Sequence, residues 1–356
     1  MSHPAIYVAI TSHGFGHAVR AATVVEKLRQ LRPDITLIFV TVAPQWLLKS
    51  YIRGDFVYRQ RVFDVGVIQS DSLTMDKQAT LKKMQDIIAE ADNIIAEEVE
   101  YIHNNNVKLI LADIPALATP IARTAGIPCW MMSNFGWDFI YRDWGDDFAE
   151  IVSWLENYYS QSDRLFRLPL SESMKAFPNV TETGLTGAKP HSEGLKQRFN
   201  LTAPQAKTIL LTFGGLGVQA TPYHNVEHFP DWQFITFDRH APNLPNLVKV
   251  ADDTLRPLDF MPLCDRVFSK PGYSTFSEAM CCDLPIVSLT RQDFAEAEIL
   301  LDGVRDYSAH QIISPEEFFT GHWEFLHQDL TPPRKTDKLA KNGATIIAQE
   351  ISNVVI

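Results

Sequence analysis

The feature that most constrains the fold is a series of short, uninterrupted apolar runs, separated by segments with helical spacing. Continuous apolar runs of this kind are typical of parallel strands that are buried on both faces. In the first half of the chain they occupy residues 5–10, 35–41, 107–112 and 128–133. Strands of this type that alternate with helices predict a doubly wound α/β sheet.

Two of the intervening segments have the spacing of amphipathic helices. The first places Val19, Ala22, Val25 and Leu28 on one face and ends before Pro33. The second predicts one long helix over residues 81–102, with an apolar stripe formed by Leu81, Met84, Ile87, Ile88, Ala91, Ile94, Ile95 and Val99.

A second series of apolar runs follows a stretch rich in proline, glycine and serine, and it includes residues 208–213, 233–237, 246–250, 266–269 and 285–289. The chain of 356 residues is long enough for two domains. We therefore expect two Rossmann-like doubly wound parallel-sheet domains that face each other across a cleft. The predicted division is an N-terminal domain over 1–165, a linker region over 166–206, a C-terminal domain over 207–336 and a C-terminal helix over 337–356.

Composition argues against several classes of protein. The formal net charge of −11 disfavours a nucleic-acid-binding surface, which needs clustered Lys and Arg. The N-terminus has no basic segment followed by an apolar one, and no apolar run approaches the roughly 20 residues that cross a bilayer. The 4 cysteines form no CxxC pair and no zinc-ligand spacing. We therefore expect a cytoplasmic protein with reduced thiols and no membrane insertion.

A glycine-containing loop follows the first predicted strand. Gly14 and Gly16 allow a ligand to approach backbone that side chains would otherwise shield. A dinucleotide fingerprint would need a third glycine, where this chain has Val19, and a carboxylate after the second strand, where it has Val40 and Thr41. The loop therefore predicts a site for a ligand other than NAD or FAD.

Two histidines flank these glycines. His13 and His17 lie on a loop rather than on one helix face, which disfavours metal ligation by the pair. His17 is instead a candidate general base, because an imidazole titrates near neutrality and can take a proton from a hydroxyl. Asp113 ends another buried strand, from which it could orient the imidazole and stabilise its cation. The structural alternative is a histidine that is hydrogen-bonded to backbone at the start of a helix.

Two loops of the second half carry groups suited to a diphosphate. Gly214 and Gly215 follow a predicted strand and could expose backbone amides, although an ordinary tight turn would have the same sequence. Ser274 and Thr275 stand where a helix is expected to begin, and a helix N-terminus attracts phosphate. Glu278, one turn further, could accept hydrogen bonds from a ribose diol or form a capping box with Thr275.

No Asp-x-Asp sequence occurs in the chain. Such a pair of carboxylates can hold a divalent cation on a diphosphate. Without it, backbone amides, a helix dipole and Lys270 would have to neutralise the leaving group. We therefore expect no metal and no other cofactor.

Residues 270–278, with residues 283–287 after them, resemble the donor-binding signature of GT-B glycosyltransferases. Within that superfamily they are similar to the peptidoglycan N-acetylglucosaminyl transferase and the galactolipid synthases of plastids. Residues 12–20, 69–76, 134–141 and 291–294 look more specifically like the glycosyltransferase-like N-terminal domain of plant L-arabinokinases. The likeness extends over most of the chain, but the kinase half of those enzymes has no counterpart in it. It implies the GT-B fold.

The resemblance also implies roles for individual residues. In related inverting enzymes a matching His is the base and a matching Asp supports it, as expected here of His17 and Asp113. The resemblance assigns the donor nucleotide to Gly214, Gly215, Phe260, Met261, Lys270, Gly272, Tyr273, Ser274, Thr275 and Glu278. It assigns the donor sugar to Arg291 and Asp293, and the acceptor to Gly14, Gly16, Asn134, Trp137 and Asp138. Many relatives have an Asp-Gln pair where this chain has residues 291–293, which leaves the identity of the sugar open.

The sequence thus predicts a metal-independent transferase that moves a sugar from a nucleoside-diphosphate donor, UDP-linked by the resemblance, to an acceptor hydroxyl with inversion. The second-domain loops would stabilise the departing diphosphate. Two alternatives remain: a nucleotide-sugar epimerase of the same fold, and a non-catalytic regulatory protein that binds nucleotide sugars. The aromatic residues of 134–144 suit either an acceptor platform or core packing.

Overall fold

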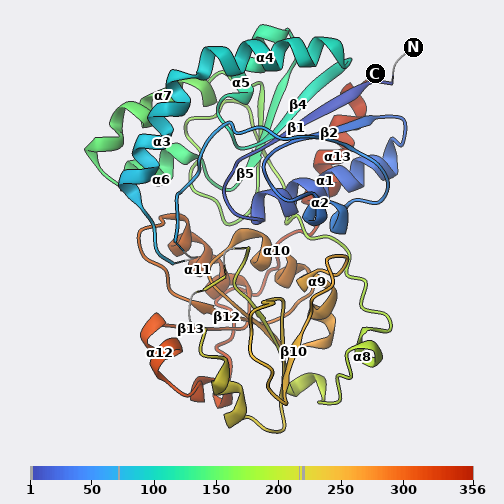
Figure 1. The fold of residues 1–356 in the computed structure, drawn as a ribbon, viewed down its shortest axis with the longest axis vertical. Coiled ribbons are helices and arrows are strands. Elements are labelled where there is room, and N and C mark those ends of the chain that lie inside the picture. Colours follow the sequence, from blue (N-terminus) through green and yellow to red (C-terminus); the bar gives the residue numbers. More distant parts are fainter. Residues whose placement is uncertain (1–2, 71–72, 216, 219–220, 356) are drawn as a thin grey trace.

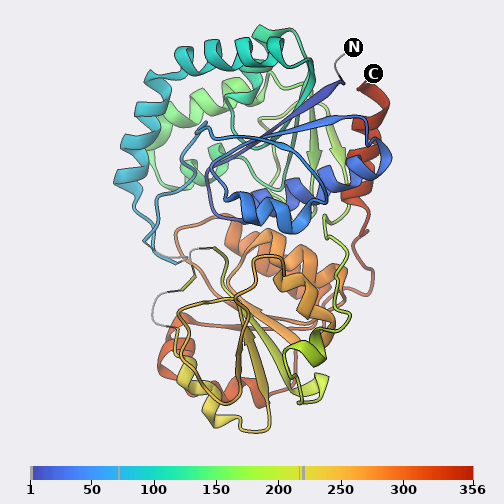
Figure 2. The ribbon, with the colours of Figure 1, turned by 45° about the vertical axis from the view of Figure 1, so that its right-hand side comes forward.

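The computed structural model describes residues 3–70, 73–215, 217–218 and 221–355. Figure 1 shows two α/β domains, with the N-terminal domain at the top and the C-terminal domain below it. Both ends of the chain lie on the N-terminal domain (Figure 2). Asp71 and Ser72, which belong to the segment 69–76, and Leu216, which follows Gly215, lie outside the described residues.

The N-terminal domain is built on a seven-stranded sheet in the order β3-β2-β1-β4-β5-β6-β7. Each of these neighbouring pairs is parallel, which confirms the predicted doubly wound sheet. The strands are β1 (Ala5–Ile10), β2 (Thr36–Val40), β3 (Val57–Arg59), β4 (Val107–Asp113), β5 (Cys129–Ser133), β6 (Arg164–Arg167) and β7 (Val180–Glu182).

Helices cover both faces of this sheet because successive side chains of a strand point to opposite faces. Ile6, Val8 and Ile10 of β1 pack toward one face, which is covered by α1 (Gly16–Leu31), α2 (Gln45–Tyr51) and α13 (Gly343–Val354). The alternate residues Tyr7 and Ala9 pack into a second cluster with the helices of the other face. Those helices are α3 (Lys77–Ala89), α4 (Ala91–Asn104), α5 (Ala118–Ala125), α6 (Trp137–Asp143) and α7 (Ala149–Tyr159).

The single long helix expected over 81–102 is wrong, because the chain bends at Glu90 and forms α3 and α4. Glu90 has φ −94° and ψ 1°, outside the helical region, and it ends one helix and begins the next. No glycine or proline marks the bend, and the apolar spacing continues through it. After the bend α4 buries Glu98, which accepts hydrogen bonds from Tyr7 of β1 and Arg59 of β3.

The N-terminal sheet extends into the range that we expected to be a linker. β6 and β7 add two strands beyond β5, so the sheet reaches Glu182. The sequence signal is weak here because β6 buries only Leu165 and Phe166, and β7 has no buried residue.

The C-terminal domain is built on a six-stranded sheet in the order β10-β9-β8-β11-β12-β13, again with parallel neighbours. Its strands are β8 (Thr208–Thr212), β9 (Gln233–Thr236), β10 (Leu247–Lys249), β11 (Arg266–Ser269), β12 (Ile286–Leu289) and β13 (His310–Ile313). Its α-helices are α9 (Pro257–Phe260), α10 (Tyr273–Cys281), α11 (Glu296–Tyr307) and α12 (Pro315–Thr320), and the short α8 (Leu195–Arg198) precedes β8. The sequence analysis found the first five of these strands and missed β13.

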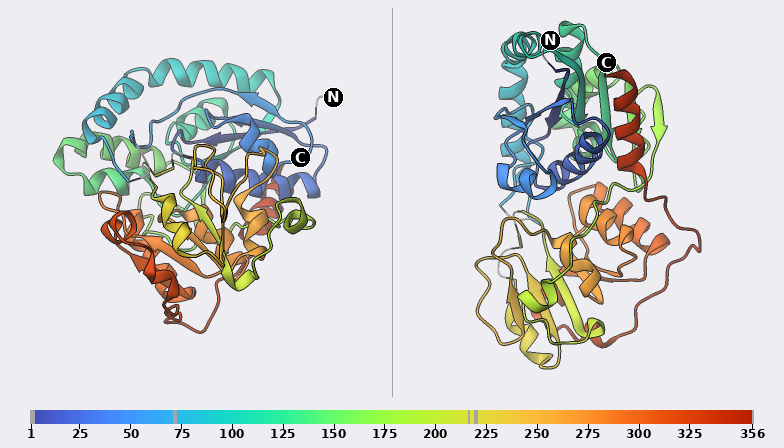
Figure 3. Two further views of the ribbon diagram at one scale, coloured as in Figure 1. Left: turned by 60° about the horizontal axis from the view of Figure 1, so that its bottom comes forward. Right: turned by 90° about the vertical axis from the view of Figure 1, so that its right-hand side faces the viewer.

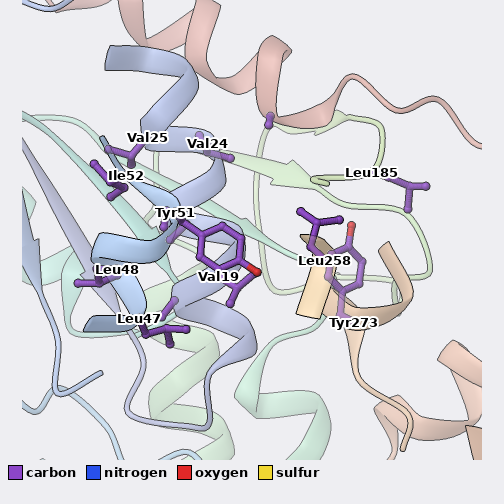
Figure 4. Close-up of a cluster of buried hydrophobic side chains, with 14 of the residues drawn as sticks. Val19, Val24, Val25, Leu47, Leu48, Tyr51, Ile52, Leu185, Leu258 and Tyr273 are labelled. Atoms are coloured by element: carbon purple, nitrogen blue, oxygen red, sulfur yellow. The ribbon is translucent and has the colours of Figure 1, made fainter. Parts of the chain in front are cut away.

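The chain returns to the N-terminal domain before it ends. Figure 3 shows it running back from the C-terminal domain, and α13 then packs beside α1. Arg32 fixes this contact by donating hydrogen bonds to the carbonyls of Ser352 and Val355. Figure 4 shows buried side chains of both domains in one cluster, including Tyr51 of the N-terminal domain and Leu258 of the C-terminal domain. The two domains therefore share a packed interface.

Candidate functional site

A cavity of about 100 Å³ lies between the two domains, at the carboxyl ends of both sheets. Its lining comes from the loop after β1, the loop after β8, the segment from β11 into α10 and the segment after β12. Ligands of open parallel sheets bind at such ends. Of the residues expected at the site, the cavity is lined by Gly14, Gly16, His17, Gly214, Gly215, Lys270, Gly272, Tyr273, Ser274, Thr275 and Arg291.

His17 and Asp113 meet at one edge of this cavity. β1 and β4 are neighbours in the sheet, and this pairing sets Asp113 beside the loop that leads into α1. The two residues are both buried, and His17 Nδ1 lies 2.8 Å from Asp113 Oδ1. When His17 donates its Nδ1 proton to this carboxylate, Nε2 is left with the lone pair that a general base needs.

Arg20 completes this pair and was not predicted as a site residue. It lies one turn after His17 on α1, and its Nε and Nη2 donate to the two carboxylate oxygens of Asp113 at 2.5 and 2.6 Å. Burial acts to raise the pKa of Asp113, but the charges and hydrogen bonds of Arg20 and His17 hold it below its usual value. Asp113 therefore stays ionised. The spacing i, i+3 on one helix is the sequence signal that could have identified Arg20.

The residues expected to bind the acceptor lie mostly behind the cavity. Asn134 accepts a hydrogen bond from Arg20 Nη1 at 2.6 Å and donates one to Glu296 of α11 at 2.7 Å. Trp137 is 1% exposed, and its indole N–H donates to Thr11. Asp138 is also buried, and burial raises its pKa to about 6. None of these three lines the cavity, whereas Phe135 of the same aromatic run does.

Lys270 lies between the two glycine loops of the C-terminal domain. A Cβ added at Gly214 would lie 4.0 Å from Lys270 Nζ, and one added at Gly272 would lie 3.8 Å from it. Burial, and then the charge of Arg291, lowers the pKa of Lys270 to about 7. Within the described part of the chain, no group accepts a hydrogen bond from this ammonium. A cation so placed is suited to an anionic ligand.

The N-termini of two helices point into the same cavity. α1 begins at Gly16 and α10 at Tyr273, and both ends belong to the lining. The two ends touch each other, because Ser274 Oγ donates a hydrogen bond to the carbonyl of Gly16 at 2.7 Å. Helix N-termini together with Arg20, Lys270 and Arg291 make the cavity electropositive, and Glu296 is the carboxylate among its lining residues.

Gly215 is needed where the loop after β8 meets the opposite domain. A Cβ added there would lie 2.6 Å from ring atoms of Phe15, so only glycine allows the two loops to pack this closely.

Glu278, expected to bind the ribose, is buried beneath the N-terminal domain and does not line the cavity. Tyr51 of α2 donates a hydrogen bond to Glu278 Oε1 at 2.8 Å, and its ring faces the Arg256 guanidinium at 4.9 Å. Burial raises the pKa of Glu278 to about 7. Phe260 and Met261, expected to hold the nucleotide base, are buried as well. A nucleoside could reach this region only if α2 moved away from α10.

The two residues expected to bind the donor sugar have separate positions. Arg291 lines the cavity, with its guanidinium 4.1 Å from the centre of the Phe294 ring. Asp293 lies outside the cavity lining and pairs with Lys77 of α3 at 2.8 Å. Across the described residues, no group of three or more His, Cys, Asp and Glu is arranged to hold a metal ion. No helix among them has both the length and the apolar character needed to cross a membrane.

Comparison of the sequence with known proteins identifies one curated relative of high significance. L-arabinokinase of Arabidopsis thaliana is 30% identical over 325 residues, which covers 88% of this chain. The chain spans 31% of the length of that enzyme. No family model matches the sequence.

Comparison of the structure gives neighbours that match over nearly the whole chain. UGT2 of Phytolacca americana, complexed with UDP-2fluoro-glucose and pterostilbene, is 11% identical with a TM-score of 0.63, covering 100% of this chain and 95% of that one. A transferase from Siraitia grosvenorii in complex with UDP is 11% identical with a TM-score of 0.57, at 99% of each chain.

A putative UDP-N-acetylglucosamine 2-epimerase from Listeria monocytogenes is also similar. It is 13% identical with a TM-score of 0.59, covering 99% of this chain and 96% of that one. At these identities the likeness establishes the architecture. Two parallel-sheet domains that face each other across a cavity, with these structural neighbours, give the chain the GT-B fold that the sequence resemblance predicted.

Proposed function

We propose that the protein is a metal-independent glycosyltransferase that moves a sugar from a UDP-linked donor to an acceptor hydroxyl. The observation that carries the proposal is that one cavity joins the His17–Asp113 pair of the N-terminal domain to the Lys270 loop of the C-terminal domain. The first group can deprotonate a hydroxyl, and the second can hold a diphosphate.

The diphosphate is proposed to lie between the glycine loops. Lys270 would supply a positive charge there, and the amides at the start of α10 would supply hydrogen bonds along a favourable helix dipole. Both would act on the charge that develops on the leaving group as the glycosidic bond breaks. Electrostatic stabilisation of this kind requires no metal ion.

The reaction follows from the opposed positions of the two groups. His17 Nε2 takes the proton of the acceptor hydroxyl, and Asp113 stabilises the imidazolium that forms. The acceptor oxygen attacks the anomeric carbon, a new glycosidic bond forms, and the bond to the diphosphate oxygen breaks with its electron pair on the diphosphate. Attack opposite the leaving group inverts the configuration at that carbon. Arg20 keeps Asp113 ionised and in position.

Structural neighbours support the donor class, because three of them are complexes with UDP or a UDP-sugar. One neighbour is complexed with the small molecule pterostilbene, which supports a small-molecule or glycoside acceptor. We propose that the reaction takes place in the cytoplasm. One experiment tests this proposal and two other functions: rearrangement of a nucleotide sugar, which the epimerase likeness favours, and binding of nucleotide sugars without turnover.

The test uses UDP-glucose, UDP-galactose, UDP-N-acetylglucosamine and UDP-arabinose, each carrying a ¹³C-labelled sugar, with a mixture of glycosides and phenolic acceptors. Mass spectrometry should detect labelled sugar on an acceptor, with release of UDP. His17→Ala should keep UDP affinity within a few-fold, because the nucleotide is held by the other domain, and should lose about 10²- to 10⁴-fold in rate.

Three results contradict the proposal. Label that stays on UDP with altered stereochemistry indicates an epimerase. Tight binding of a UDP-sugar without any product indicates a sensor. Full activity of His17→Ala removes the proposed base from the mechanism.

A further inference from the structure

His13 is a second histidine of the cavity, and the mechanism above does not use it. It lies on the loop after β1 and belongs to the lining together with His17. Its ring centre is 6.3 Å from that of His17. A side chain this close to the proposed base can contact the same substrate.

One hydrogen bond determines which nitrogen of His13 carries the proton. The backbone N–H of Val67 donates to His13 Nδ1 at 3.2 Å. A ring nitrogen that accepts a hydrogen bond cannot itself carry a proton. The ring is therefore uncharged, and its single proton is on Nε2. Protonation of Nδ1 would set two N–H groups against each other.

Aromatic rings hold the His13 ring in one orientation. It stacks on Phe294 of the opposite domain, with ring centres 5.7 Å apart and planes at 15°. It also meets Trp137 edge to face at 5.2 Å. Behind it, a Cβ added at Gly66 would lie 2.3 Å from His13 Cβ, so the backbone at Gly66 packs tightly against His13. The Nε2–H is therefore held in a fixed direction.

The charges around His13 favour the same state. Burial is the largest cause that lowers the pKa of His13 well below its usual value, and any positive charge on His17, Arg291 or Lys270 acts in the same direction. The nearby carboxylates do not bond to His13. Asp64 accepts from Thr11 and the Ser12 amide through Oδ1, and its buried Oδ2 has no hydrogen-bond partner among the described residues. Glu296 accepts from Asn134.

We infer that His13 presents its Nε2–H to the cavity as a fixed, neutral hydrogen-bond donor, and that this N–H donates to a hydroxyl oxygen of the donor sugar. The inference rests on the proposed function. In a nucleotide sugar the sugar lies between the diphosphate and the attacking hydroxyl, which here means between Lys270 and His17. His13 lies among these groups and stacks on Phe294, next to the segment that carries Arg291. A neutral donor orients a hydroxyl without adding another charge to an already cationic cavity.

The protonation state can be measured without substrate. Protein labelled with ¹⁵N in histidine gives ring-nitrogen resonances by NMR, and His13 is assigned by the signals that disappear in His13→Gln. We expect an Nε2-protonated ring that does not become cationic between pH 5.5 and 8. A ring protonated on Nδ1, or one that titrates in this range, would overturn the inference.

Two variants distinguish the two ring nitrogens of His13. The amide of Gln reaches the position of Nε2 and can donate there, whereas the amide of Asn reaches only the position of Nδ1. Calorimetric titrations use UDP and whichever of UDP-glucose, UDP-galactose, UDP-N-acetylglucosamine and UDP-arabinose the wild type binds most tightly. His13→Asn should weaken UDP-sugar binding about 2- to 10-fold, as expected for one neutral hydrogen bond, and change UDP binding less than about twofold. His13→Gln should restore UDP-sugar binding to within about twofold of wild type.

Equal losses for UDP and UDP-sugar would place the N–H on the diphosphate and overturn the inference, as would an unchanged affinity of His13→Asn for the UDP-sugar. A wild type that binds UDP but none of the UDP-sugars has no such sugar contact, and this result would overturn the inference. A wild type that binds neither UDP nor UDP-sugars refutes the proposed function itself, while the NMR result still reports the state of His13. Melting curves identify any variant that is not folded.

Discussion

Binding of a nucleoside diphosphate should draw a proton onto Lys270. In the free protein, burial and the charge of Arg291 lower the pKa of Lys270 to about 7 from its usual 10.5. At pH 8, therefore, only about a tenth of the molecules carry the proton. A diphosphate beside Gly214 and Gly272 would favour the ammonium and return its pKa toward the usual value. Binding at pH 8 should then take up about 0.9 proton per nucleotide.

Titration calorimetry in buffers of different ionisation enthalpy measures this uptake. UDP contributes little at pH 8, because the second pKa of a terminal phosphate is about 6. Lys270→Met should abolish the uptake and bind UDP about 10- to 150-fold more weakly, since a charge-assisted hydrogen bond contributes about 1.5–3 kcal/mol. Glu278→Gln controls for the other group in this region with a pKa of about 7, and should keep the uptake.

UDP affinity should depend on pH for the same reason. Because the unliganded protein loses the Lys270 proton above about pH 7, UDP affinity of the wild type should fall about tenfold per pH unit between pH 8 and 9. Lys270→Met should show no such fall. A wild type whose binding heat is independent of the buffer, or a Lys270→Met variant that still takes up the proton, would refute the placement of the diphosphate at Lys270.

Three further predictions concern Glu278, Arg20 and metal ions. Burial raises the pKa of Glu278 to about 7 from 4.5, so the folded protein retains a proton there that the unfolded chain releases, and the free energy of unfolding should fall as pH rises from 4.5 to 7. In urea unfolding, the free energy of unfolding of Glu278→Gln should lack this decrease between pH 4.5 and 7. The same variant should bind UDP at least about fivefold more weakly if the ribose reaches Glu278. Unchanged affinity in the folded variant would place the ribose elsewhere. Arg20→Met leaves the buried Asp113 charge without its guanidinium partner and should lower the free energy of unfolding by about 3–5 kcal/mol. Arg20→Met/Asp113→Asn should recover part of this loss, and simple addition of the two effects would contradict the pairing. UDP affinity should be the same with and without EDTA, and a loss that magnesium or manganese restores would contradict the metal-free site.

The sheets were predictable because their strands are buried on both faces. A fully apolar run such as residues 5–10 indicates a buried parallel strand even when the strands that pair with it are not known. The edge strand β7, whose residues are exposed or half-buried, carries no such signal. The bend at Glu90 was not predictable either, since no residue there favours a break and the apolar spacing is continuous.

The site was predictable where it depends on sheet topology alone. His17 and Asp113 follow neighbouring strands, so their proximity required only that both strands end at the same edge. Contacts between the domains were not predictable. Tyr51 meets Glu278 only because α2 packs over α10, and sequence spacing contains no information on that approach. The same holds for Val67, whose backbone amide determines the tautomer of His13.

The central claim is that the cavity between the domains holds the diphosphate of a nucleotide sugar opposite His17. A structure of the protein with bound UDP tests it most directly. We predict the diphosphate within hydrogen-bond distance of Lys270 Nζ and of the backbone amides at the start of α10, with α2 withdrawn so that the ribose reaches Glu278. UDP bound outside this cavity, or inside it with no contact between the diphosphate and Lys270, would contradict the claim.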